Sequence, residues 1–349
     1  LPKVWESNIN KTFNKDILTN IFEFCDPPLK NVCCKWKKIL KENDYIWLIW
    51  YKKRWTNTIF TGNWNEIYLK MHKLDFNWFN SIYHKTCFYE NSWIMNSKLI
   101  DNYILTSSKW GIIKLWDTND LRKPPYIYSG HLGPVSCIDF DIKQRLIVSG
   151  SHDGTIRLWN FDNHHYTKML THHTDEIYSI KLDNNNIYST SKDTTLKIYN
   201  IDSENVITLH GHLNSVWDLI LDNKNNIYSC SLDGAVKFWE IDKNYKCTLT
   251  LNISNYSVLS LCYYNNYLFL GNWDGSIQVY FHHKLIYNLK LHQQFITSIK
   301  IIDDKLITVG YDNQVKIFKV IYYPTFKLIL KNIITSDKLT SIAVNNNSL

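Results

Sequence analysis

The stretch SGSHDGTIRLWN, residues Ser149–Asn160, decides the fold of this chain. An Asp-Gly pair between apolar residues is a strong signal for a β-hairpin whose two central turn residues both favour positive φ. After that pair, the apolar residues Ile156 and Leu158 alternate with Thr155, Arg157 and Trp159, as in a β-strand. We therefore expect a strand, a tight turn and a second strand.

The same pattern occurs six times along the chain. The turn position falls at Trp110, Asp153, Asp193, Asp233, Asp274 and Asp312, with spacings of 38–43 residues. A histidine precedes four of these turns by 20–22 residues, at His131, His173, His212 and His292, and an apolar strand-like segment follows each histidine. Self-similarity at such a period predicts a repeat architecture.

These repeats resemble the WD-repeat family, which carries a Gly-His, a turn Asp and a terminal Trp-Asp in units of about 40–45 residues. The resemblance covers about residues 90–344 and implies a β-propeller with buried polar sets. The second unit would use His131, Ser149 or Ser151, Asp153 and Trp159; the fourth would use His212, Ser229 or Ser231, Asp233 and Trp239. Because buried polar groups need partners, we expect a structural role for Asp153 and for one of the serines of the opening stretch, and a hydrolase triad is not indicated.

Some units depart from the pattern. Trp110 replaces the turn Asp in the first unit, and Ser254 replaces the histidine in the fifth. The terminal aromatic is Tyr199, Tyr280 or Phe318 in the third, fifth and sixth units; Phe318 has no donor, so that polar set must be incomplete. A further apolar stretch at 339–344 resembles the start of a seventh unit, which an N-terminal strand at 81–89 would help to complete. We therefore expect a mainly β propeller of seven blades, the last one incomplete.

The first eighty residues have a helical period instead. Apolar stripes over 16–24, 32–40 and 45–50 are separated by Pro27-Pro28 and Asn43-Asp44. Their order, with VCCKW and YIWLIW, resembles an F-box over about residues 13–55, although Phe13-Asn14 stands where that family has Leu-Pro. We expect an F-box-like helical domain at 10–60, a linker helix at 61–80 and the propeller at 81–349.

The two resemblances together imply the substrate-recognition subunit of a Skp–cullin–F-box ubiquitin ligase. Such a subunit is not an enzyme, needs no cofactor, and is found in the cytoplasm or nucleus. It would contact the Skp adaptor, and through it the cullin scaffold, with Ile17, Leu18, Ile21, Phe22, Trp36 and Trp47.

The family resemblance also implies a substrate site on one face of the propeller, the top face, which carries the Asp turns and the Gly-His loops. The residues expected there are Lys109, His152, Tyr178, Lys192, Trp217, Trp273 and Tyr311. This set is aromatic with a few bases and almost no acids, and aromatic groups anchor peptides well. A phosphorylated segment is an alternative, but phosphate receptors favour Arg and none maps to this set.

Composition limits the other classes. The net charge is +7 with the lysines spread along the chain, so a nucleic-acid stripe is not indicated. The eight cysteines form no Cys-x-x-Cys pair, and no apolar run approaches 18 residues, so neither a zinc ribbon nor a membrane segment is expected. Two rivals stay open: a propeller scaffold unrelated to ubiquitin, and a metal enzyme using the adjacent pairs His164-His165, His172-His173 and His282-His283, whose side chains should diverge.

Overall fold

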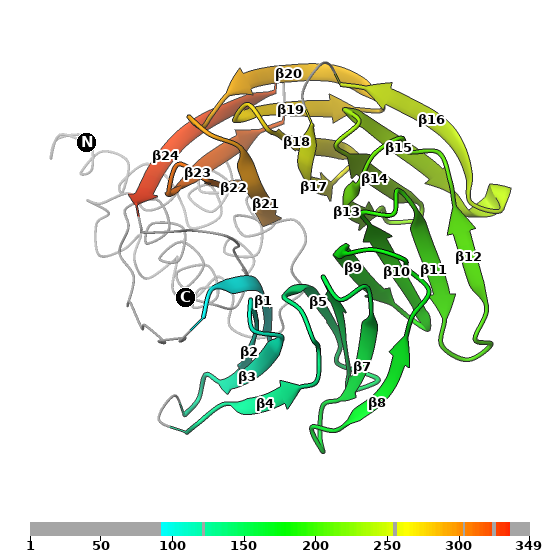
Figure 1. The fold of residues 1–349 in the computed structure, drawn as a ribbon. Helices are drawn as coiled ribbons and strands as arrows, with labels where there is room; N and C mark the ends of the chain where they lie inside the picture. The colour runs from blue at the N-terminus through cyan, green and yellow to red at the C-terminus, as the bar shows by residue number, and fades with distance from the viewer. Residues whose placement is uncertain (1–91, 121–122, 254–256, 303, 323–325, 336–349) are drawn as a thin grey trace, which may run out of the picture. The chain divides into compact units, whose positions relative to one another are not determined.

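The computed structural model describes residues 92–120, 123–253, 257–302, 304–322 and 326–335. Within these ranges the chain forms six antiparallel sheets of four strands each. The sheets are arranged one after another around a central axis, as the blades of a β-propeller (Figure 1). The predicted β-propeller is confirmed, and six complete blades account for every strand described.

The first three blades are formed as follows. Blade 1 contains β1 (Ile94–Ile100), β2 (Tyr103–Ser108), β3 (Ile112–Asp117) and β4 (Tyr126–Ser129). Blade 2 contains β5 (Val135–Asp141), β6 (Leu146–Ser151), β7 (Ile156–Asn160) and β8 (Tyr166–Leu170). Blade 3 contains β9 (Ile177–Asp183), β10 (Asn186–Ser191), β11 (Leu196–Asn200) and β12 (Val206–Leu209).

The other three blades repeat this order. Blade 4 contains β13 (Val216–Leu221), β14 (Ile227–Ser231), β15 (Ala235–Glu240) and β16 (Lys246–Asn252), with a short 3₁₀ turn, η1 (Ile241–Lys243), before β16. Blade 5 contains β17 (Val258–Tyr264), β18 (Tyr267–Asn272), β19 (Ser276–Phe281) and β20 (Lys284–Lys290). Blade 6 contains β21 (Ile296–Ile302), β22 (Lys305–Gly310), β23 (Gln314–Ile321) and β24 (Lys327–Thr335).

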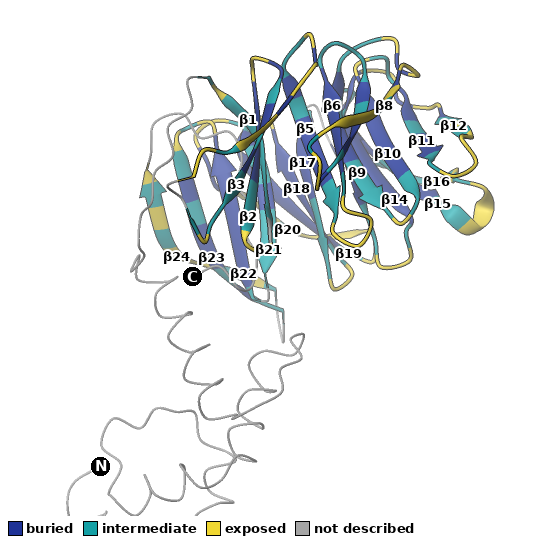
Figure 2. Cartoon of the chain, turned by 90° about the horizontal axis from the view of Figure 1, so that it is seen from below, coloured by how far each residue is buried: buried dark blue, intermediate teal, exposed yellow. Residues whose placement is uncertain are grey.

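The apolar core lies between neighbouring blades. The innermost strands β1, β5, β9, β13, β17 and β21 pack against one another in that order. One core cluster joins Leu105 and Tyr128 of blade 1 to Ile138 and Trp159 of blade 2. Because side chains alternate along each strand, one set packs on the preceding blade and the other on the next. Burial is therefore deepest in the strands and lowest in the loops and outermost strands (Figure 2).

The Asp-Gly turn differs from the prediction. Gly154 has φ of +78°, whereas Asp153 is not among the residues with positive φ. The Gly154 N–H donates to the Ser151 carbonyl at 3.2 Å, so His152 and Asp153 form the centre of the turn and the glycine follows it. This longer loop, a turn followed by one left-handed residue, is a common hairpin connection. The expectation of positive φ at both turn residues was wrong.

Several predicted features lie outside the described residues. These are the F-box-like domain at 10–60 with its six adaptor-binding residues, the linker helix at 61–80, and the strands at 81–89 and 339–344. The domain boundaries and the seventh, incomplete blade therefore stay predictions. Among the described residues, no helix is long and apolar enough to cross a membrane.

Candidate functional site

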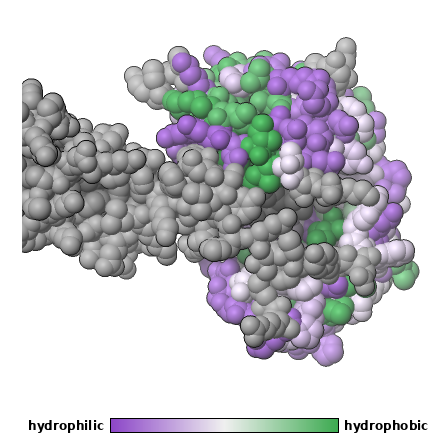
Figure 3. Space-filling view, turned by 90° about the vertical axis from the view of Figure 1, so that its left-hand side faces the viewer, coloured by the Kyte–Doolittle hydropathy of each residue, from purple (hydrophilic) through white to green (hydrophobic). Residues whose placement is uncertain are grey.

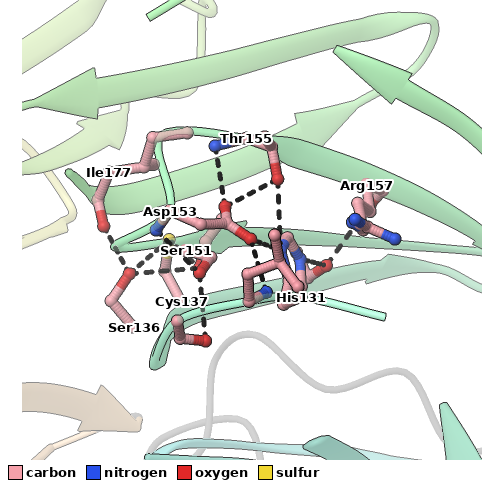
Figure 4. Close-up of polar contacts among 12 residues, drawn as sticks. His131, Ser136, Cys137, Ser151, Asp153, Thr155, Arg157 and Ile177 are labelled. Carbon is pink, nitrogen blue, oxygen red and sulfur yellow. Dashed lines mark hydrogen bonds and ion pairs between the residues drawn. The ribbon is translucent and has the colours of Figure 1, made fainter. Parts of the chain in front are cut away.

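A closed polar set holds the top of blade 2 together, and Figure 4 shows its central part. His131 contacts Asp153 through Nδ1 at 2.9 Å and Ser149 through Nε2 at 2.8 Å. The Trp159 indole N–H donates to the same Ser149 hydroxyl at 2.8 Å. Thr155 donates to Asp153 from its hydroxyl and from its backbone N–H. Of the two predicted serines, Ser149 is therefore the one that completes the set.

The other blades keep as much of this set as their residues allow. Blade 4 is complete, with His212, Asp233, Ser229 and Trp239 in the same contacts. Blades 3 and 6 keep the histidine, hydroxyl and aspartate, but Tyr199 and Phe318 replace the tryptophan. In the described part of blade 1, the last contact is present, from Trp116 to Thr106 at 3.0 Å. Blade 5 has Leu270 at the hydroxyl position, as its register against Gln278 shows.

The geometry of this set gives it a structural role. We call His131, Ser149, Asp153 and Trp159, with their counterparts in the other blades, the clamp. Both ring nitrogens of His131 are occupied, and Ser149 is fully buried, so the hydroxyl is not presented to a substrate. The set ties the loop before β5 to the β6–β7 turn, since Asp153 also accepts the Leu132 N–H at 2.9 Å. Such fully satisfied networks fix one arrangement of a buried region.

These contacts shift the clamp aspartates in one direction. Burial acts to raise the pKa of Asp233, but hydrogen bonds from His212, Leu213 and Ala235 outweigh it and lower the pKa to about 2. Asp153 and Asp193 are held well below the usual carboxyl pKa by the equivalent histidine and threonine contacts, again against burial. Each aspartate is therefore more acidic in the folded chain than in the unfolded one.

We expect the fold to be sensitive to acid. Because the folded-state pKa values are depressed, this stabilisation is complete above the ordinary carboxyl pKa of 3.8 and is lost as the pH falls towards 2. Thermal unfolding followed by circular dichroism should show a falling midpoint between these pH values. The Asp233→Asn variant should be less stable at pH 7 and should depend less on pH below 4. If the stability of Asp233→Asn fell with pH as that of the parent does, the clamp aspartate would not be the cause of the acid sensitivity.

A second regular feature positions the top face. In every blade, the residue just before the turn position (Trp110 in blade 1, an Asp in the others) donates its N–H to the carbonyl of the residue just before the innermost strand. The six contacts, at 2.9–3.0 Å, join Lys109 to Trp93, His152 to Pro134, Lys192 to Glu176, Leu232 to Ser215, Trp273 to Ser257 and Tyr311 to Phe295. The predicted pre-turn residues thus share one edge of the propeller, and each has a neighbour that was not predicted.

In blades 2 to 4, the predicted residues form one connected group. The Tyr178 ring lies 4.5 Å from that of Trp217 and 5.8 Å from that of His152, between ring centroids. The Tyr178 hydroxyl donates to Glu176 at 2.9 Å, and Lys192 lies 3.5 Å from Glu176. The carboxylates of Asp175 and Glu176, which the predicted set did not include, therefore lie beside its basic groups in this sector. The charge of Glu176, followed by that of Asp175, raises the pKa of Lys192.

In blades 5 and 6, three rings form a continuous stack. The Phe295 ring lies between Trp273 and Tyr311, with centroid distances of 4.8 and 4.5 Å and interplanar angles of 15° and 18°. Trp273 and Tyr311 are 52% and 54% exposed. We call these three residues the aromatic stack. Phe295 was missed because the sequence argument considered pre-turn and strand residues, not the residue just before each innermost strand.

Blade 1 adds a smaller aromatic group. The Lys109 ammonium lies over the Trp93 ring, 4.7 Å from its centroid, and both Trp93 and Trp110 are exposed. The top face therefore has two kinds of surface. Blades 2 and 3 carry basic side chains that lie beside carboxylates, and blades 5, 6 and 1 present exposed aromatic rings.

Comparisons with known proteins agree with this architecture. The family model "WD domain, G-beta repeat" matches residues 122–160, 165–200 and 203–240. Autophagic-related protein 16.2 of Caenorhabditis elegans is 39% identical over 54 residues, 16% of this chain and 10% of that protein. E3 ubiquitin-protein ligase COP1 of Arabidopsis thaliana is 30% identical over 87 residues, 25% of this chain and 13% of that protein. The crystal structure of RRP9 WD40 repeats has a TM-score of 0.65 at 19% identity, covering 72% of this chain and 83% of that one.

These matches are local and do not extend over a whole protein, since the chain spans about a tenth of the length of these curated relatives. The solved structure shares the fold. Propellers of this kind typically bind proteins. The chain therefore carries WD repeats within residues 122–240, and its described residues form a β-propeller of six blades.

Proposed function

We propose that this chain is the substrate-recognition subunit of a Skp–cullin–F-box ubiquitin ligase. Residues 13–55 would contact the Skp adaptor, and the top face would hold a segment of the protein substrate. The subunit would carry out no bond chemistry itself. It would raise the local concentration of the substrate beside the ubiquitin-carrying partner.

The aromatic stack is the observation that supports substrate binding at the top face. Large exposed apolar groups that gather at one place on a soluble protein commonly mark an interaction surface. Trp and Tyr are enriched among the residues that dominate binding energy, because each buries a large area at a small entropy cost. The stacked arrangement also holds Trp273 and Tyr311 in fixed orientations before a partner arrives.

The charges of the top face favour an apolar or aromatic segment over a phosphorylated one. Lys192 is within 3.5 Å of both Asp175 and Glu176, and His152 lies 3.9 Å from Glu176. A phosphate at this place would have to displace or face those carboxylates. Two of the three basic side chains that could bind a phosphorylated segment, Lys192 and His152, therefore already lie beside carboxylates.

The ligase assignment rests on the F-box-like order of residues 13–55 beside a propeller, and on partial similarity to a relative whose name states ubiquitin-ligase activity. The test is binding of purified Skp adaptor to the full chain, measured beside a variant with Trp36→Ala and Trp47→Ala. We expect binding by the parent chain and its loss in the variant. A folded parent chain that fails to bind the adaptor would exclude the ligase role and leave a scaffold of another complex.

A further inference from the structure

The outermost strands of blades 5 and 6 expose more apolar surface than the outermost strand of blade 4. On β16 the exposed positions hold lysine, threonine and asparagine, and the apolar side chains between them are half-buried. β20 and β24 instead each expose three aliphatic side chains by 40–50%, and Figure 3 shows hydrophobic surface on that side of the propeller. We call these six residues the side patch: Leu285, Ile286, Leu289, Ile329, Leu330 and Ile333.

The two strands meet at the rim of one core cluster. Tyr287 of β20 packs edge-on against Phe326, just before β24, with ring centroids 5.3 Å apart, and both rings pack on the cluster between blades 5 and 6. Leu289 pairs with a residue of β19 and Leu330 with a residue of β23, and both of these partners belong to the same cluster. Because paired residues share a face of the sheet, Leu289 and Leu330 continue the core between the blades outward into solvent.

The charge around the side patch has one sign. Lys284 and Lys290 stand at the two ends of β20 and Lys327 begins β24, all three are exposed, and neither strand contains an acidic residue. None of the three pairs with a carboxylate within the described ranges. Between blades 2 and 3, in contrast, Lys168 of the outermost strand β8 pairs with Glu204. A partner that covers the side patch should therefore bring acidic groups around an apolar centre.

The edges of the two strands favour a helix over an added strand. The pairing of β20 shifts register opposite Val279 and Tyr280, and that of β24 shifts opposite Ile317 and Phe318, as β-bulges do. A bulge interrupts the regular row of N–H and C=O groups that a further strand would need. An amphipathic helix satisfies its own backbone and needs only an apolar surface for its apolar face.

Two other occupants fit this surface less well. A second copy of the chain, bound through the same patch on both copies, would place lysines against lysines. An anionic membrane would suit the lysines, but proteins that lie at a membrane interface commonly anchor with exposed aromatic rings. The aromatic residue on the two strands is Tyr287, and it is half-buried in the cluster between the blades.

We propose that the side patch binds an acidic amphipathic helix of a partner protein. The apolar face of the helix covers Leu289 and Leu330, and its Asp or Glu side chains pair with Lys284 and Lys290. This partner is a different protein from the substrate held at the top face. The proposal therefore does not depend on the ubiquitin-ligase role.

The test is fluorescence anisotropy on the full chain with a labelled peptide of about 18 residues, or five helical turns, that carries Leu on one face and Glu on the other. We expect binding by the parent chain and an affinity at least tenfold lower in the double variant Leu289→Ser, Leu330→Ser. The matched control is Tyr166→Ser, Met169→Ser on β8, where the side chains are 47% and 43% exposed, and it should bind as the parent does. No binding by the parent, or equal binding by all three proteins, would overturn the proposal.

A charge exchange separates binding from a structural role. The variant Lys284→Glu, Lys290→Glu should lose the Glu peptide and should bind a second peptide in which Lys replaces every Glu. The parent should prefer the Glu peptide, with an affinity that falls as the salt concentration rises. A parent chain that binds both peptides equally would contradict an acidic partner.

Two further assays test the other occupants. Sedimentation equilibrium should give a monomer, and the chain should not sediment with vesicles of phosphatidylcholine and phosphatidylserine. Dimer formation, or vesicle binding, that Leu289→Ser, Leu330→Ser abolishes would assign the side patch to a second copy or to a membrane and would overturn the proposal.

Discussion

Replacing Trp159 with alanine is expected to lower the free energy of unfolding by about 3–5 kcal/mol. The side chain is 1% exposed and lies in the core between blades 1 and 2. Its ring packs edge-on against Tyr128 and His131, at centroid distances of 5.9 and 6.0 Å. The substitution removes this volume and also leaves the Ser149 hydroxyl without one of its partners. Denaturant unfolding of the parent and variant measures the difference.

Two controls separate the causes of that loss. Trp159→Phe keeps most of the ring but removes the N–H donor, and should cost about 1–2 kcal/mol. Blade 6 already has Phe318 at this position and keeps its His292–Thr308 contact at 2.8 Å. Trp110→Ala removes an equally large side chain that is 71% exposed, and should change stability by no more than about 0.5 kcal/mol. Equal effects of Trp159→Ala and Trp110→Ala would show that burial and the clamp contacts of Trp159 do not stabilise the fold.

Replacing both Trp273 and Tyr311 with alanine is expected to weaken binding of a captured protein partner by roughly 30-fold or more. This corresponds to about 2 kcal/mol, the usual threshold for a dominant interface residue. The two rings lie at the ends of the aromatic stack, where each presents one face outward and the other to Phe295. Because both are about half exposed, thermal stability should change little. The measurement is the dissociation constant for the partner isolated with the parent chain.

A matched control lies on another surface. Exposed apolar residues also occur on the outermost strands β20 and β24, and Figure 3 shows hydrophobic surface on the side of the propeller that faces left in Figure 1. The residues are Leu285, Ile286, Leu289, Ile329, Leu330 and Ile333. Leu285→Ala removes a side chain exposed to the same degree as Trp273 and should leave partner binding unchanged. If Leu285→Ala weakens binding and the double variant does not, the partner binds the outermost strands instead of the top face.

The repeat and its clamp were largely predictable from the sequence. The spacing of the turn aspartates and histidines predicts the blades, and the structure joins His131 to Asp153 and His212 to Asp233 as expected. The choice between Ser149 and Ser151 was not predictable, because residues two apart on a strand lie on the same face. The turn conformation was also beyond the pattern, since Asp-Gly occurs in both short and longer hairpin loops.

The sequence indicated some of the residues of the top face and not others. All seven predicted residues lie among the described ones, and each contacts an aromatic or charged neighbour. Phe295 and Glu176 were missed because their role depends on a backbone hydrogen bond between the turn and the residue before the innermost strand. Once that contact is known, the residue just before each innermost strand can be assigned to the top face from the sequence.

The central claim, that the top face binds the protein partner, is tested most directly by hydrogen–deuterium exchange of the chain with and without that partner. The account predicts slower exchange in the segments that carry the aromatic stack, residues 272–276, 293–297 and 310–313. Slower exchange confined to the outermost strands β20 and β24, with these three segments unchanged, would contradict it.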